Sequence, residues 1–207
     1  MKQQLFIAFE GIDGSGKSTQ VKLLAEKLRQ EGHKVYSTFE PTDNPIGSLI
    51  RNIFKGRMTA DHKTIAALNV ADRLDHLYND VNGIIKKLEE GYTVITDRYY
   101  FSSYAYHGVH VDIDWVIAAN AMSAAALKPA IHIFIDVPPA LSMERLNSTR
   151  GTIDLYETLD NLEQVRAKFM EAFEKLKATE NIVFIDGNQT IAAIAKDVWE
   201  NVSDIAK

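Results

Sequence analysis

Apolar and polar positions follow two alternating patterns along the chain. Five short runs consist almost entirely of apolar or β-branched residues, at 5–9, 35–39, 92–96, 131–137 and 182–185. In longer segments between them, apolar residues recur every three to four positions, the period of an amphipathic helix. These segments span 20–30, 68–88, 162–176 and 191–202. Apolar strands that alternate with helices predict parallel βαβ units whose sheet is covered on both faces.

No linker rich in Pro, Gly or Ser and no internal repeat divides the sequence. At ~150 residues per domain, a chain of 207 residues would hold one or two domains. We therefore expect a single three-layer α/β domain over 1–207, with a five-stranded parallel sheet flanked by helices. The spacing of the strands predicts helical insertions between the second and third strands and after the fourth.

Composition removes several classes of chemistry. The chain contains no cysteine, which excludes disulfides, cysteine-ligated zinc, iron–sulfur clusters and thiol nucleophiles. The net charge, 23 − 28 = −5, argues against a broad basic surface for nucleic acid or for an anionic membrane. An anionic ligand would therefore have to bind at a local cluster of basic groups.

The sequence shows no export or membrane signal. Residues 1–4 lead into only five apolar positions, too few for the core of a signal peptide. The longest weakly polar stretch, 115–127, contains Asn120 and Ser123 and is too short to span a bilayer. We expect a cytoplasmic protein.

A glycine-rich segment follows the first predicted strand and opens the first predicted helix. Its sequence fits G-x-x-x-x-G-K-[ST], the P-loop motif. Glycines let consecutive backbone N–H groups point at one phosphate, and the start of the helix adds its positive end. Lys17 supplies a mobile cation for the β- and γ-phosphates, and the Ser18 hydroxyl suits Mg²⁺. The residues predicted to bind the phosphates of ATP are Gly11, Ile12, Asp13, Gly14, Ser15, Gly16, Lys17, Ser18 and Thr19.

Proteins with this motif differ in what they do with the γ-phosphate, and the sequence helps to distinguish GTPases, motor or transport ATPases and kinases. A GTPase switch would need a guanine-reading N-K-x-D segment, which the sequence lacks. Its one D-x-x-G string, at 80–83, falls inside the predicted helix over 68–88 rather than at a strand end. A motor or transport ATPase is usually larger. A small P-loop domain with helical insertions is typical of a nucleotide or metabolite kinase, which binds two anionic ligands side by side.

Charged residues occur where such a kinase needs them. Asp97 and Arg98 follow the third predicted strand, whose carboxyl end faces the ligand crevice in a doubly wound sheet. Asp97 is a candidate for orienting Mg²⁺ or its water, and Arg98 for binding an acceptor phosphate. Arg145 and Arg150 flank a polar stretch followed by glycine, which predicts a closing lid over about 145–157.

Seven motifs, met in order, give the chain a family resemblance. They are F-E-G-I-D-G-S-G-K-S-T (9–19), E-P-T (40–42), A-D-R (71–73), D-R-Y (97–99), S-S-Y-A-Y (102–106), K-P (128–129) and R-G-x-x-D-x-x-E (150–157). With these motifs, the sequence resembles the thymidylate kinase family along nearly its whole length. The resemblance implies a P-loop fold, phosphorylation of dTMP to dTDP with ATP and Mg²⁺ on the way to dTTP, and a homodimer.

The resemblance also implies roles for matching residues. Asp13 looks like the carboxylate near the acceptor's 3′-hydroxyl and phosphate, and Arg98 like the arginine that binds this phosphate. Arg73 is similar to the arginine that hydrogen-bonds the thymine edge. Ser102 and Tyr106 resemble pocket residues, and the Tyr106 ring would crowd the ribose 2′-position.

A lid arginine is implied in the same way. Gly14 stands where some members carry a P-loop arginine, and members without it look like the bacterial type, whose lid supplies the cation. Arg150 is the first candidate for this cation and Arg145 the second, because charge on the transferred group must be neutralised in a dry site. The expected catalytic residues are Lys17, Arg98, Arg150 and Asp13.

Three positions in the expected dTMP site depart from the family. Phe39 replaces the arginine before the E-P pair, Asn69 replaces an aromatic that stacks on the base, and His107 stands where glutamine is common. These changes keep another nucleoside monophosphate or deoxynucleoside kinase open as an alternative. A non-catalytic regulatory module is the alternative from a different class, and it would bind ATP without acceptor-dependent release of ADP.

Overall fold

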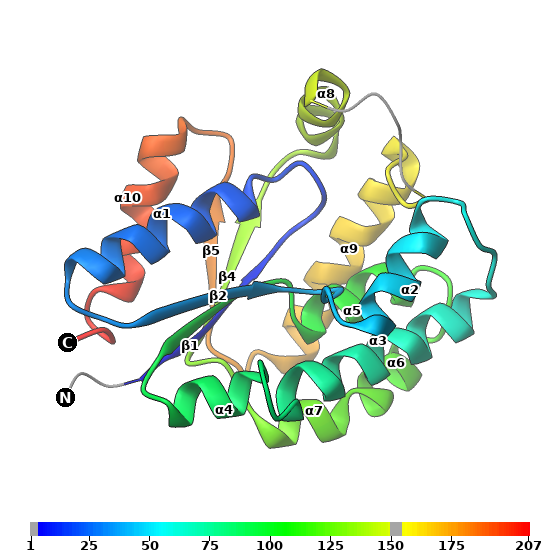
Figure 1. Ribbon diagram of the computed structural model, residues 1–207. Coiled ribbons are helices and arrows are strands. Elements are labelled where there is room, and N and C mark those ends of the chain that lie inside the picture. Colours follow the sequence, from blue (N-terminus) through cyan, green and yellow to red (C-terminus); the bar gives the residue numbers. More distant parts are fainter. Residues whose placement is uncertain (1–3, 150–154) are drawn as a thin grey trace.

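All five predicted strands form, each within one residue of its expected bounds. The computed structural model describes residues 4–149 and 155–207 (Figure 1). The strands are β1 (Phe6–Glu10), β2 (Val35–Phe39), β3 (Thr93–Asp97), β4 (Ile131–Asp136) and β5 (Ile182–Asp186). Their near-continuous apolar character suits a sheet that is buried on both faces.

The strands pair in the order β2-β3-β1-β4-β5, and all pairs are parallel. Ile7 in the central strand lies opposite Ile95 on one side and Ile131 on the other, and all three are buried. The chain leaves β1 toward β2 and later crosses to β4, so the strand order reverses beside β1. Ligands of such sheets bind outside the carboxyl ends of the strands at this point.

Helices cover both faces of the sheet, which gives the predicted three-layer α/β architecture (Figure 1). One apolar core packs α1 (Lys17–Gln30) and α10 (Ile191–Val202) on residues such as Ile7 and Ile95. The other core packs α5 (Tyr100–Gly108) and α9 (Leu159–Leu176) on residues such as Phe134.

The remaining helices are insertions in the crossovers. The expected insertion between β2 and β3 consists of α2 (Pro45–Phe54), α3 (His62–Tyr78) and α4 (Ile84–Glu89). After β4 the chain forms α8 (Pro139–Thr149) before α9, and α6 (Ile113–Ala119) and α7 (Ala121–Ala126) follow α5. Among the described residues, no helix is both long and apolar enough to cross a membrane.

The prediction of one continuous helix over 68–88 is wrong. The side-chain oxygen of Asn79 accepts hydrogen bonds from the backbone N–H groups of Val81 and Asn82, at 3.0 and 3.3 Å. This local bond competes with the helical ladder and closes a turn between α3 and α4. Val81 is consequently 77% exposed instead of buried, and the D-x-x-G string lies in the turn rather than in a helix.

Candidate active site

The glycine-rich loop joins β1 to α1 at the carboxyl edge of the sheet. Gly14 has φ 78°, and a Cβ there would lie 2.6 Å from the carbonyl oxygen of Ser142 in α8. Glycine therefore allows both the backbone conformation and the close approach of α8. Gly16 (φ 95°) directly precedes α1, so the loop runs straight into the N-terminus of a helix. This arrangement is the anion-binding geometry expected from the motif.

Lys17 lies over this loop. Its side chain is buried, and Nζ donates to the carbonyl oxygens of Gly11 (3.0 Å) and Ile12 (2.9 Å). Burial lowers the pKa of Lys17 to about 8, and the charge of Arg98 adds to this, while Asp97 and Asp13 oppose it. Near neutral pH the loop therefore carries a positive charge at the place where the motif requires one.

Ser18 and Asp97 meet where β1 and β3 lie side by side. The Ser18 hydroxyl donates to Asp97 Oδ2 at 2.5 Å. A hydroxyl and a carboxylate are hard oxygen donors of the kind that Mg²⁺ prefers, and the remaining positions are usually filled by water and substrate phosphates. In the ranges 4–149 and 155–207, no three His, Asp or Glu side chains form a protein-only metal cage. The donor set fits Mg²⁺ bound together with a nucleotide.

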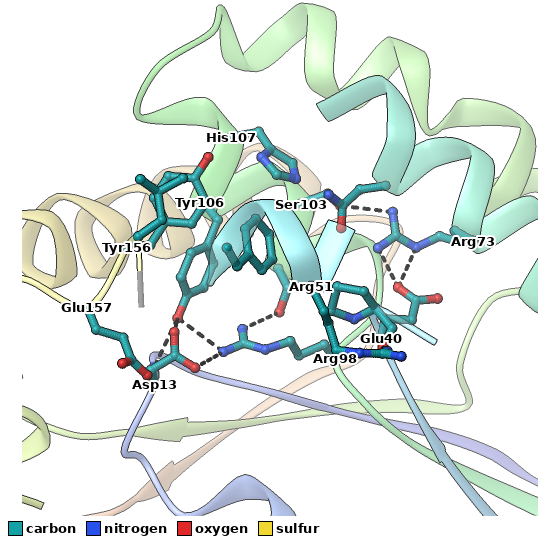
Figure 2. Close-up of a pocket in the computed structure, with 15 residues that line it drawn as sticks. Asp13, Glu40, Arg51, Arg73, Arg98, Ser103, Tyr106, His107, Tyr156 and Glu157 are labelled. Carbon is teal, nitrogen blue, oxygen red and sulfur yellow. Dashed lines mark hydrogen bonds and ion pairs between the residues drawn. The ribbon is translucent and has the colours of Figure 1, made fainter. Parts of the chain in front are cut away.

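Arg98, Asp13 and Tyr106 form one hydrogen-bonded cluster (Figure 2). Arg98 Nη2 lies 2.5 Å from Asp13 Oδ1, and the Tyr106 hydroxyl donates to Asp13 Oδ2 at 2.8 Å. The same hydroxyl accepts from the Asp13 backbone N–H (2.9 Å) and from Arg98 Nη2 (3.2 Å). Burial would raise the pKa of Asp13, but the positive charges of Arg98 and Lys17 lower it overall. Asp13 is therefore held ionised beside Arg98.

Two pockets adjoin at this cluster. The first lies between the loop and helices α2, α3 and α5, and its lining residues are Asp13, Glu40, Pro41, Arg51, Phe54, Asn69, Arg73, Arg98, Ser102, Ser103, Tyr106, His107, Leu155, Tyr156 and Glu157. The second lies over the glycine-rich loop and includes Lys17, Ser18, Asp97 and Arg145. Both pockets include Asp13, Glu40 and Arg98. Two ligands bound side by side would meet there.

Arg73 lies at the other end of the first pocket from Asp13, and it is 1% exposed (Figure 2). Its Nε and Nη2 donate to Glu40 Oε2 at 2.9 and 2.5 Å. Its other N–H groups reach the backbone oxygen of Tyr99 and the side chains of Ser103 and Asn120. All five N–H groups thus have protein acceptors, so a hydrogen bond to a base would have to replace one of them.

Phe39, Asn69 and His107, the three positions that differ from the family pattern, do not all lie in the first pocket. Phe39 is 43% exposed and lines the pocket over the glycine-rich loop, not the one expected to hold dTMP. Successive side chains of a strand point to opposite faces, so Phe39 points away from Glu40, which faces Arg73. Asn69 and His107 do line the first pocket. Burial and the charge of Arg73 lower the pKa of His107 to about 3, so its ring is neutral.

Some lining residues were missed at the sequence level. Arg51 of α2 lines the first pocket and donates to the Pro41 carbonyl oxygen at 2.7 Å. Tyr156 also lines it and packs edge-on against Phe54, with ring centroids 5.4 Å apart. An arginine within the apolar helix α2 was the available signal for Arg51. Tyr156 lay inside the R-G-x-x-D-x-x-E motif without an assigned role.

The predicted lid is described at its two ends only. Arg145 in α8 lines the second pocket and donates to the Gly187 carbonyl oxygen at 3.0 Å. At the other end, the backbone N–H of Leu155 donates to the Phe54 carbonyl oxygen at 3.1 Å. Arg150, the first candidate for the lid cation, lies outside the described residues.

Comparison with known proteins gives a consistent result. The family model described as "Thymidylate kinase" matches residues 9–198. A "Probable thymidylate kinase" of Caldivirga maquilingensis is 38% identical over 206 residues, covering 98% of this chain and 95% of the relative. One from Thermococcus kodakarensis is 38% identical over 207 residues, covering 92% and 97%. The motifs of the two adjoining pockets, the family match and these relatives agree, and the chain belongs to the thymidylate kinase family.

Proposed function

We propose that this chain transfers the γ-phosphoryl group of ATP to dTMP, giving dTDP and ADP. In this step the bond from the γ-phosphorus to the bridging oxygen breaks, and a bond to a phosphate oxygen of dTMP forms. The observation that carries the proposal is the pair of adjoining pockets that share Asp13 and Arg98. Membership of the family supports the choice of both substrates.

The donor side follows from the glycine-rich loop. Its backbone N–H groups and the Lys17 ammonium would hold the phosphates of ATP. Ser18, with Asp97, would hold Mg²⁺ when the nucleotide is bound. The metal ion would supply positive charge that neutralises charge on the phosphate oxygens during transfer.

The acceptor side follows from Arg98 and its neighbours. Arg98 faces Asp13 across the junction of the pockets, so it would hold the acceptor phosphate in line with the donor. No general base is needed, because the attacking phosphate oxygen is already anionic and positioning lowers most of the barrier. The Tyr106 ring would exclude a ribose 2′-hydroxyl, and Arg73, Ser102 and Asn69 would surround the nucleoside.

The lid over 145–157 would close on the bound substrates and bring Arg150 to the transferred group. We treat it as an insertion within a single domain over 1–207. At the two described ends of this segment, Arg145 bonds the Gly187 carbonyl oxygen and the Leu155 N–H bonds the Phe54 carbonyl oxygen. Closure would exclude water and strengthen the electrostatic interactions in the site.

A wider acceptor range is the second candidate function. Asn69 and His107 make the first pocket more polar than a stacking aromatic would, and the Nδ1 atom of His107 is buried with no hydrogen-bond partner among the described residues. These polar groups would accept a base other than thymine. A panel of acceptors separates the two candidates.

A second copy of the chain is the partner we propose. Trp115 of α6 and Met122 of α7 are large apolar side chains on consecutive helices, and they are 44% and 66% exposed. This Ala-rich surface would allow the helices of two copies to pack closely. Sedimentation of the purified chain tests the dimer.

Direct detection of dTDP tests the proposed reaction. The chain is mixed with ATP, Mg²⁺ and dTMP, and the products are separated and quantified. We expect dTDP and ADP in equal amounts, and a loss of at least about 10³-fold in turnover for Lys17→Ala, because the loop then lacks its charge on the phosphates. Release of ADP without dTDP, or full activity of the variant with an intact fold, would contradict the proposal.

A further inference from the structure

Glu10, the last residue of β1, is buried and lines neither pocket. Both of its carboxylate oxygens have partners. Oε1 accepts the backbone N–H of Tyr99 at 3.0 Å, and Oε2 accepts the hydroxyl of Ser102 at 2.5 Å. Both partners lie next to Arg98, one along the backbone and one at its guanidinium.

The backbone partner holds an unusual conformation in place. Arg98 has φ 75°, and it is the one non-glycine residue in the described ranges with a positive φ. Such a conformation is costly and persists only where the surroundings enforce it. The N–H of Arg98 donates to the Phe9 carbonyl oxygen at 2.8 Å, and the next N–H, that of Tyr99, donates to Glu10. Two successive residues of β1 thus hold the backbone on both sides of Arg98.

The side-chain partner orients the guanidinium. Arg98 Nη1 donates to Ser102 Oγ at 3.1 Å. A hydroxyl has one proton, and because Ser102 gives its proton to Glu10, its oxygen lone pairs are left to face Arg98. Glu10 therefore fixes the direction of the Ser102 hydroxyl, which in turn fixes one side of the guanidinium.

We propose that Glu10 is a positioning residue that holds Arg98, by its backbone and through Ser102, in the conformation that binds the acceptor phosphate. This role rests on the proposed function for the identity of the acceptor, whereas the coupling of Glu10 to Arg98 stands on the contacts alone.

A simple packing role does not account for a carboxylate at this position. Burial raises the pKa of Glu10 to about 7, even though Ser102, Arg98 and Arg73 lower it. Burying an ionisable group is unfavourable unless specific partners compensate, and an apolar residue would fill the same space at less cost. The two hydrogen-bond donors to Glu10, the Tyr99 N–H and the Ser102 hydroxyl, both lead to Arg98.

Glu10→Gln keeps the shape and removes the charge. The amide oxygen still accepts the Tyr99 N–H, but the amide nitrogen would donate to Ser102, whose hydroxyl proton then loses its acceptor at residue 10 and whose direction is no longer fixed. We expect the KM for dTMP to rise about tenfold, because a hydrogen bond to a charged group contributes a free energy of about this size. The KM for ATP should change by less than about twofold.

Glu180→Gln is the matched control. Like Glu10, Glu180 accepts a side-chain hydroxyl, here that of Tyr100 at 2.7 Å, and it lines neither pocket. We expect its KM values to match those of the unsubstituted chain. An unchanged KM for dTMP in Glu10→Gln, or equal changes in both variants, would overturn the positioning role. In an Arg98→Ala background, a further tenfold rise from Glu10→Gln would also overturn it.

A crystal structure of ligand-free Glu10→Gln gives a readout that does not depend on the substrate. We expect Arg98 to leave its positive φ or to turn away from Ser102. An unchanged Arg98 overturns the inference, whereas failure of the unsubstituted chain to form dTDP overturns only the proposed function. If Glu10→Gln does not fold, the structure of Ser102→Ala is determined instead. A displaced Arg98 guanidinium would support the inference, and an unmoved one would contradict it.

Discussion

At the scale of single residues, Tyr106 combines two separable properties. Its hydroxyl forms hydrogen bonds with Asp13 and Arg98. Its ring lies under the Arg98 guanidinium, with Cζ of Arg98 4.7 Å from the ring centroid. The hydroxyl would orient the charged cluster, whereas the ring would occupy the space that a ribose 2′-hydroxyl needs.

Two variants separate these properties of Tyr106. Tyr106→Ala removes the ring, so we expect the ratio of kcat/KM for dUMP to that for UMP to fall about tenfold, the scale set by small steric differences in a pocket. Tyr106→Phe keeps the ring and should keep the ratio, while its KM for both acceptors rises. The two acceptors differ only at the 2′-position, so an unchanged ratio in Tyr106→Ala rules out the steric role.

His107 makes the stability of the chain depend on pH. Its pKa is about 3 in the folded chain against 6.5 for an unperturbed histidine. The unfolded chain therefore binds the proton more tightly, and stability that is fully present above pH 6.5 is lost as the pH falls toward 3. The variant His107→Gln has no titrating group at this position, so its stability should not show this fall with pH. Between pH 7 and 5 the unfolding free energy of the parent should fall by about 2 kcal/mol relative to the variant.

Urea unfolding of both chains at the two pH values measures this difference. Comparing the parent with the variant cancels the titration of the other groups. Parallel pH dependences would show that His107 is not held neutral in the folded chain.

Sequence analysis could place residues whose position in the fold follows from the residues next to them in the chain. Lys17 and Ser18 belong to a contiguous loop, and Arg98 directly follows a strand, so a motif and a strand end suffice to place them. Glu10 was overlooked because its partners Tyr99 and Ser102 lie about ninety positions away. Phe39 lines the pocket over the glycine-rich loop and not the first pocket, and sequence adjacency to Glu40 does not reveal which face of a strand a side chain occupies.

At the scale of elements, near-continuous apolar or β-branched runs made the strands predictable, whereas helix ends were less so. The apolar positions of α3 and α4 keep a helical spacing across the turn between them, so periodicity does not detect the break. The signals were Asn79, whose side chain bonds the backbone, and Gly83 just before α4. Local hydrogen-bonding chemistry was the better guide there.

The lid carries the prediction that belongs to this scale. The lid over 145–157 remains a sequence-based prediction, in which Arg150 reaches the phosphoryl group when the lid closes. Arg150→Ala should lower kcat by about 10²-fold or more and change the KM for dTMP much less. Steady-state kinetics with each substrate varied in turn gives the two constants.

Arg145→Ala provides the comparison for this lid variant. The Arg145 side chain reaches Gly187 beside the pocket over the glycine-rich loop, so its loss should act mainly on the KM for ATP. If Arg150→Ala raises the KM for dTMP and leaves kcat intact, Arg150 is a binding residue and not the lid cation.

At the scale of the whole molecule, the chain is acidic, but several of its basic side chains gather in the two adjoining pockets. The net charge of −5 coexists with two adjoining pockets rich in positive charge. Lys17 lines the donor side, Arg98 lies at the junction, and Arg73 and Arg51 line the acceptor side. The carboxylates Asp13 and Glu40 pair with Arg98 and Arg73 and keep them in place. The parallel sheet brings these residues together because its strands end at one edge.

The central claim is that this site phosphorylates dTMP, and a panel of acceptors tests it most directly. Release of ADP is followed with dTMP, dUMP, UMP, dCMP and dGMP under the same conditions. The account predicts acceptor-dependent ADP release with the highest kcat/KM for dTMP. A higher kcat/KM for another acceptor, or no acceptor-dependent release at all, would contradict it.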